Sequence, residues 1–129
     1  MDIQVMLKEA ITQVKDLETC GKVGALAEYL QFMYNQNICA VDTDVRNMLF
    51  YYICAKYEID GTFEENWIKV SNAITDLRTY IESNESLYNF VTNIFEDTKK
   101  EVVKDIELLK DFKVPKNVFE GIDTVEDLI

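Results

Sequence analysis

The scarcity of residues that interrupt helices is the strongest constraint on how this chain folds. Its 129 residues include one proline and four glycines. A β-sandwich or barrel needs turn residues at short, regular intervals, and this chain does not have enough of them. A chain of this length forms one domain rather than two independent cores. We therefore predict an all-α fold, a compact bundle of about five helices with a long C-terminal helix and a short acidic tail.

Apolar residues recur at alternating spacings of three and four, which places them on one face of a helix. This periodicity predicts helices at about residues 2–18, 23–34, 43–57, 63–81 and 85–112. Turn-forming residues separate these segments, at Gly21 and Gly24, 35–37, Asp60-Gly61 and 83–86. We expect one helical-bundle domain over residues 1–113. Residues 114–129, after the break at Val114-Pro115, form an acidic and apolar tail that is either docked on the bundle or mobile.

The fourth predicted helix has the clearest start signal. Thr62 is followed three residues later by Glu65, which is the spacing of a capping box. In this motif the threonine side chain accepts a bond from the backbone amide of the glutamate. The glutamate side chain in turn accepts a bond from the backbone amide of the threonine. Asp42 and Thr43 are similarly placed to cap the third helix. These capping roles account for the polar residues without assigning them a catalytic function.

The net charge of the chain limits the classes of partner that it can bind. It carries 24 acidic and 13 basic residues, for a net charge of −11. Such a surface repels phosphate backbones and anionic lipids, so we expect no direct binding to nucleic acid or membrane. A protein partner with a basic surface is favoured. The first residues do not resemble a secretion signal, and the three cysteines form no CxxC pair, so we expect a cytoplasmic protein with reduced thiols.

The chain contains no histidine. This excludes Ser-His-Asp and Cys-His catalytic groups, imidazole metal sites and the usual general base near neutral pH. The segment 21–24 matches no phosphate-binding loop, and three scattered cysteines do not provide a zinc site. We therefore expect a protein that is not an enzyme and that uses no cofactor or metal.

The third predicted helix is apolar or aromatic on every side. Phe50, Tyr51 and Tyr52 point in three directions, and one core cannot take all three. Tyrosine is favoured at interfaces because its ring is apolar and its hydroxyl can hydrogen-bond. The alternative is core packing with hydroxyls that reach water. The interface interpretation predicts a partner, or a second copy in a homodimer, on this helix.

Three functions fit these features. The leading one is a small acidic protein-binding module, an inhibitor or accessory factor such as a phage-encoded inhibitor of host defence or an immunity-type protein, which occupies a basic groove of its partner. The second is a structural or assembly protein that works as a homo-oligomer, and the third is a carboxylate-only enzyme or small-ligand binder. Acidic residues off the apolar stripes would form the binding face, although a merely solvated face would look the same: Glu64, Asp76, Glu82, Glu85, Glu96, Asp97, Glu101 and Asp105.

Overall fold

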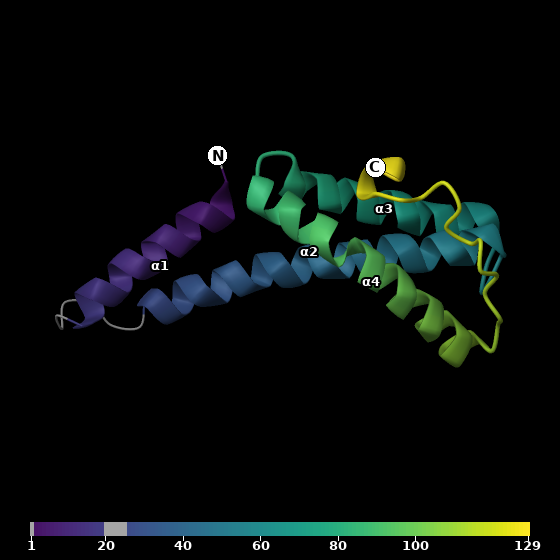
Figure 1. The fold of residues 1–129 in the computed structure, drawn as a ribbon, viewed down its shortest axis with the longest axis horizontal. Helices are drawn as coiled ribbons and strands as arrows, with labels where there is room; N and C mark the ends of the chain where they lie inside the picture. Colours follow the sequence, from purple (N-terminus) through teal and green to yellow (C-terminus); the bar gives the residue numbers. More distant parts are fainter. Residues whose placement is uncertain (1, 20–25) are drawn as a thin grey trace.

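A computed structural model describes residues 2–19 and 26–129 and confirms the all-α class (Figure 1). Over these residues the chain forms four α-helices and one 3-10 turn, rather than the five helices predicted. Their bounds are α1 (Ile3–Thr19), α2 (Leu26–Lys56), α3 (Phe63–Ile81), α4 (Glu85–Lys110) and η1 (Val125–Asp127). The predicted break at Gly21 and Gly24 lies outside the described residues.

The predicted second and third helices are one continuous helix, so the expected break at residues 35–37 was wrong. Asn37 lies within α2 and donates from Nδ2 to Gln4 Oε1 of α1 at 2.6 Å, while Gln4 Nε2 donates to the Tyr34 carbonyl at 3.0 Å. Val41 is fully buried in the core that follows. These tertiary contacts outweigh the weak turn preference of asparagine, and the segment contains no proline or glycine to stop the helix.

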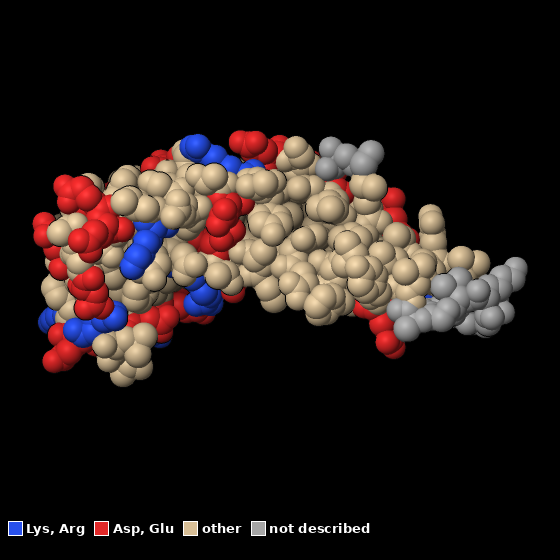
Figure 2. Space-filling view, turned by 180° about the vertical axis from the view of Figure 1, so that it is seen from behind, with Lys and Arg blue, Asp and Glu red and all other residues tan. Residues whose placement is uncertain are grey.

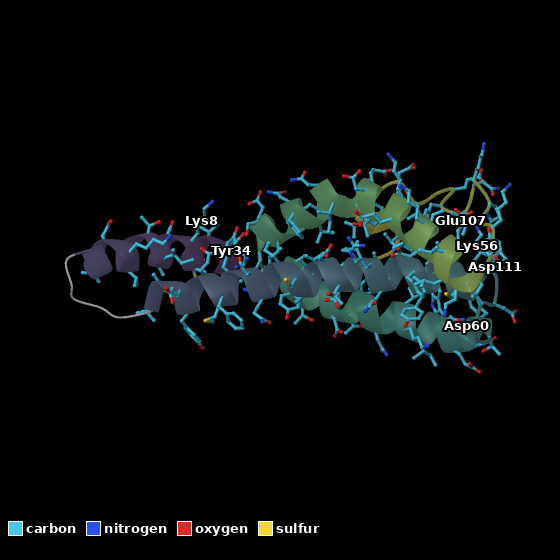
Figure 3. All side chains as sticks on the ribbon, turned by 90° about the horizontal axis from the view of Figure 1, so that it is seen from below. Lys8, Tyr34, Lys56, Asp60, Glu107 and Asp111 are labelled. Carbon is cyan, nitrogen blue, oxygen red and sulfur yellow. The ribbon has the colours of Figure 1, made fainter. Side chains whose placement is uncertain are left out.

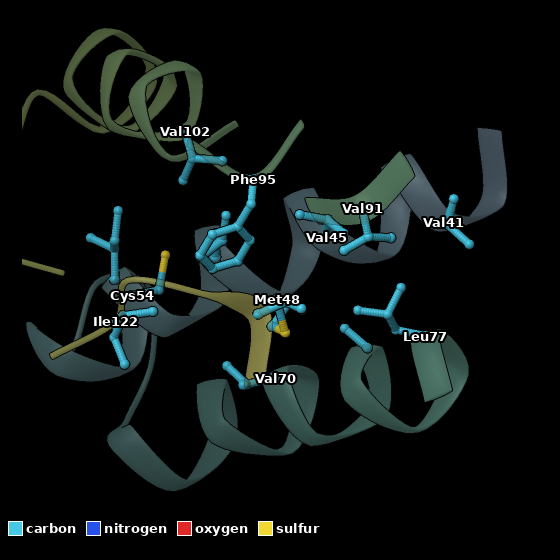
Figure 4. Packing of buried hydrophobic residues seen from close by; sticks show 14 of the residues in the cluster. Val41, Val45, Met48, Cys54, Val70, Leu77, Val91, Phe95, Val102 and Ile122 are labelled. Atoms are coloured by element: carbon cyan, nitrogen blue, oxygen red, sulfur yellow. The ribbon is translucent and has the colours of Figure 1, made fainter. Parts of the chain in front are cut away.

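The C-terminal part of α2 packs with α3 and α4 into the body of the molecule, which we define as residues 41–129. Its hydrophobic core starts at Val41 and includes Met48, Leu77 and Val91, all fully buried (Figure 4). Four buried residues from the C-terminal segment complete it: Val114, Val118, Ile122 and Val125. The predicted apolar stripes of α3 and α4 therefore face one shared core.

The N-terminal part of the molecule is an arm made of only two helices, α1 and residues 26–40 of α2. The two helices lie side by side and extend away from the body (Figure 1). Asp2 joins the start of α1 to the start of α4, because its carboxylate accepts bonds from the Gln4 and Val5 amides and from the Ser86 hydroxyl at 2.6 Å. The Ile3 amide donates to Asn84 Oδ1 at 2.5 Å. One end of the arm is thereby fixed to the body.

The turn between α2 and α3 is held by a buried amide. Thr62 caps α3 by accepting a bond from the Glu65 amide at 3.2 Å, as the forward half of the predicted capping box requires. The Asn66 side chain, which is buried, donates to the carbonyls of Cys54, Ile59 and Thr62. The position of α3 against α2 therefore depends on side-chain hydrogen bonds as well as on apolar packing.

The C-terminal segment lies docked across the body, which was one of the two states considered for the tail. Lys56 Nζ donates to the Val118 carbonyl at 3.0 Å and Lys99 Nζ donates to the Ile122 carbonyl at 2.9 Å. In the chain before this segment, the end of α4 projects beyond the core (Figure 1). Leu109 continues the apolar spacing of Val102 and Ile106 but is 69% exposed. The apolar stripe of α4 therefore continues in the sequence beyond the residues that the core covers.

Candidate functional site

The eight acidic residues expected to form a binding face are exposed but do not share one face. Glu64 and Glu82 lie at opposite ends of α3, about 27 Å apart at 1.5 Å per residue. Glu85 begins α4, and Asp76 lines a hollow between α2 and α3. Glu96 forms an ion pair with Lys99 at 2.8 Å. The charge is thus spread over the body.

Three of the eight residues do form a line. Asp97, Glu101 and Asp105 follow one another at intervals of four along α4, so their carboxylates share one side of this helix. Arg46 of α2 crosses to this side and binds both Glu101 and Asp42, the latter at 3.3 Å. Its hydrogen bond to Glu101 is the main cause of a raised pKa for the guanidinium. The line is the most concentrated acidic surface among the predicted residues.

The aromatic residues of α2 are half-buried and engaged within the chain. The Phe50 and Tyr51 rings meet edge to face at 5.2 Å, and Lys69 Nζ lies 4.8 Å from the Tyr51 centroid. Tyr52 stacks on Phe119 of the C-terminal segment at 5.9 Å. Tyr51 and Tyr52 thus join α2 to α3 and to the C-terminal segment. Whether the three rings also contact a partner stays a prediction.

The exposed aromatic surface lies instead on the arm, away from the three rings that were expected to face a partner. Tyr29 and Phe32 of α2 are 59% and 58% exposed. Between Tyr29 and Val41 no charged residue occurs. The uncharged run is visible in the sequence, but the break expected at residues 35–37 divided it, so it was not recognised as part of one helix.

The arm is also thinly packed. Among its described residues the buried apolar ones are Leu7, Ile11 and Ala27, a single seam between two helices. On α1, Ile3, Met6 and Leu17 fall within about 60° of one another at 100° per residue, and all three are exposed. On α2 a similar arc holds Leu26 and Tyr29, which are exposed, and Met33, which is half-buried. Each helix of the arm therefore carries an apolar stripe that the other helix does not cover.

One face of the molecule shows this division directly (Figure 2). Uncharged surface covers most of the arm, while acidic and basic side chains gather over the body. Residues 1–40 hold five acidic and three basic residues, a net charge of −2. Residues 41–129 hold the remaining 19 acidic and 10 basic residues, a net charge of −9. The acidity that dominates the composition belongs to the body.

A hollow between α2 and α3 holds the one carboxylate with a strongly shifted pKa among the described residues. Burial, and secondly the charge of Asp76, raise the pKa of Asp44 to about 6. The same hollow is lined by Cys39, Thr43 and Tyr80. Over the described part of the chain, no group of three or more acidic or cysteine side chains is arranged to hold a metal ion.

No helix in the described ranges has the length and apolar character needed to span a bilayer. Comparison of the chain with known protein families, with curated proteins and with solved structures finds no match.

Proposed function

We propose that the protein is a protein-binding module that pairs with a second copy of itself through the arm. The observation that carries this proposal is the exposed apolar surface of the arm. Of the twelve large apolar side chains that are exposed in the described part of the chain, seven lie on the arm: Ile3, Val5, Met6, Leu17, Leu26, Tyr29 and Phe32. Apolar side chains gathered in this way mark an interaction site.

The total surface of the molecule supports the same conclusion. The chain exposes 8089 Å², whereas a compact monomer of this mass exposes about 7,000 Å². The excess of roughly 1,000 Å² is close to the area that one partner buries in a stable interface, about 800 Å². The two-helix arm that projects from the body adds to this surface (Figure 1).

Charge favours a second copy as the occupant. Two acidic bodies repel each other, so any contact between copies is least opposed where charge is lowest. The arm meets this condition, since Tyr29 to Val41 is uncharged. In a two-fold dimer each arm would cover the apolar stripes of the other, and four helices would form a bundle with an ordinary core. The two bodies would then point outward.

The test is the mass of the full chain in solution, measured by sedimentation velocity across a wide range of concentration. We expect a mass of twice 15.0 kDa. Tyr29→Lys should raise the dimer dissociation constant at least about tenfold, because an aromatic anchor within the exposed stripe of α2 is replaced by a charge. Leu108→Lys is the control, since Leu108 is also an exposed apolar side chain but lies on the body. A monomeric wild type at all concentrations would refute the proposal.

A second candidate function uses the acidic body. The line of Asp97, Glu101 and Asp105 supports an inhibitor or accessory factor that occupies a basic groove of a cytoplasmic partner, as phage-encoded inhibitors and immunity-type proteins do. Free thiols at Cys39 and Cys54 suit that compartment. Capture of one stoichiometric basic protein, lost with Asp97→Asn/Asp105→Asn, would favour this function. Capture that is unchanged in this variant would count against it.

A further inference from the structure

An open groove of about 770 Å³ runs between α4 and the C-terminal segment. One wall is formed by residues 96–107 of α4 and the other by residues 113–120. Its volume falls within the range of small-molecule sites, about 300–1,000 Å³. Glu107 belongs to the α4 wall of the groove and is labelled in Figure 3.

The floor of the groove is apolar and fixed. It is formed by Val103, Val114, Pro115, Val118 and Phe119. Val114 and Val118 are buried in the core, and the Phe119 ring stacks on Tyr52 at 5.9 Å. Because these contacts hold the C-terminal segment in place, the apolar surface in the groove is preformed.

Lysine dominates the rim, which is unexpected in so acidic a chain. Five of the 13 basic residues of the protein line this groove: Lys99, Lys100, Lys104, Lys113 and Lys116. Lys99 has a structural role, since its side chain is 12% exposed, is paired with Glu96 and donates to the Ile122 carbonyl.

The other four lysines are exposed and stand in two pairs. Lys100 and Lys104 lie on consecutive turns of α4, and Lys113 and Lys116 lie on the facing wall. Within the described part of the chain, none of the four side chains forms an ion pair or a hydrogen bond with another residue. Their ammonium groups are therefore available to a ligand.

The acidic residues of the groove do not cancel this charge. Glu96 is held by Lys99, and Glu107 Oε2 accepts a bond from the Val114 amide at 3.2 Å. Counting Glu120 as the third, the groove has five lysines and three glutamates, a charge of +2. The rest of the chain then carries −13, since the total is −11. An anion is favoured here and repelled over most of the remaining surface.

We infer that this groove binds an amphiphilic organic anion. The phosphate or carboxylate head of the ligand would lie between the two lysine pairs, and its apolar tail would cover the floor at Val103 and Phe119. Unpaired cations beside a preformed apolar surface recognise both parts of such a ligand, whereas a simple ion or a neutral apolar compound would satisfy only one. The site is separate from the arm and does not depend on pairing.

The test measures the binding of decyl phosphate to the full chain, at concentrations below those at which it forms micelles. Calorimetry and the NMR shifts of the backbone amides detect this binding. Inorganic phosphate tests the anionic head alone, and decanol tests the apolar tail alone. We expect one decyl phosphate per chain, shifts at residues 99–119, and at least about tenfold weaker binding of either fragment. Binding only to vesicles of phosphatidic acid, or equal binding of decanol, would overturn the inference of a soluble anionic ligand.

Two charge reversals locate the site. Lys104→Glu and Lys113→Glu, on opposite walls, should each weaken decyl phosphate binding about tenfold, because attraction becomes repulsion. Lys8→Glu is the matched control, since Lys8 is an exposed lysine on α1, within the arm (Figure 3). Circular dichroism checks that each variant is folded. Wild-type affinity in both groove variants, or an equal loss in the control, would refute the site.

Discussion

At the scale of single residues, Asp44 is the clearest conflict between charge and position. Its carboxylate is partly buried in the hollow between α2 and α3, and Asp76 faces the same hollow. Burial first, and then the charge of Asp76, raise its pKa to about 6. A carboxylate with a raised pKa in the native state opposes folding at neutral pH, because the native state binds the proton more tightly than the unfolded chain does.

Asp44→Asn should therefore stabilise the protein at pH 7. The native pKa of about 6 exceeds the ordinary value of 3.8, so the cost of the charge is absent below pH 3.8 and complete above pH 6. We expect a gain in unfolding free energy of about 1 kcal/mol at pH 7, reduced by solvent screening of a carboxylate that is only partly buried. Urea unfolding at pH 7 and near pH 4 measures it.

Asp105→Asn serves as the control for this pH effect, since it removes one exposed negative charge from α4. If removal of any negative charge stabilises the protein, both variants will gain equally at pH 7. A gain for Asp44→Asn that persists at pH 4 would likewise show that the raised pKa is not its cause.

At the scale of elements, sequence patterns identified the helices better than the break between them. The capping signal at Thr62 marked the start of α3 correctly, because the cap and the helix that it serves are adjacent in sequence. Asn37 was predicted to form a turn from its sequence neighbours, but its side chain bonds to Gln4, which is 33 residues away. A bond between distant residues leaves no periodic signal, so the continuity of α2 could not be predicted.

The same limit applies to the candidate surfaces. The sequence indicated correctly that acidic residues would lie on the outside, since charged side chains are rarely buried. The spacing of four between Asp97, Glu101 and Asp105 within one predicted helix already placed them on one side. The sequence could not show that Arg46 of α2 reaches Glu101, because this contact depends on how α2 and α4 pack. The lysine groove was missed for the same reason, since Lys104 and Lys113 meet only when the C-terminal segment folds back on α4.

The contact between Asn37 and Gln4 predicts how the arm behaves as an element. Asn37→Ala leaves the buried Gln4 Oε1 without this donor, which should cost about 1–3 kcal/mol. Because the arm has a single apolar seam, the loss should appear as faster hydrogen exchange in α1, with α3 unchanged. Asn35→Ala is the control, since Asn35 is exposed and its side chain accepts a bond from Gln31, which is also exposed. Equal loss of protection in α1 and α3 would show that arm and body unfold together.

At the scale of the whole molecule, charge and apolar surface occupy different ends. The body carries −9 and the arm −2, while the uncharged run of the arm holds its exposed aromatic residues. The separation gives each end a distinct response to salt. Contact between arms is limited by repulsion of the two bodies, whereas contact between the acidic body and a basic partner depends on attraction.

Salt should therefore strengthen self-association. Added sodium chloride screens the repulsion between two chains of net charge −11 and leaves the apolar contact of the arms intact. We expect the dimer dissociation constant to fall several-fold between low and physiological salt, in sedimentation velocity at constant protein concentration. Self-association that weakens with salt would instead place attractive charges at the interface. In that case the lysine groove of one copy and the acidic line on α4 of another, rather than the two arms, would be the surfaces that meet.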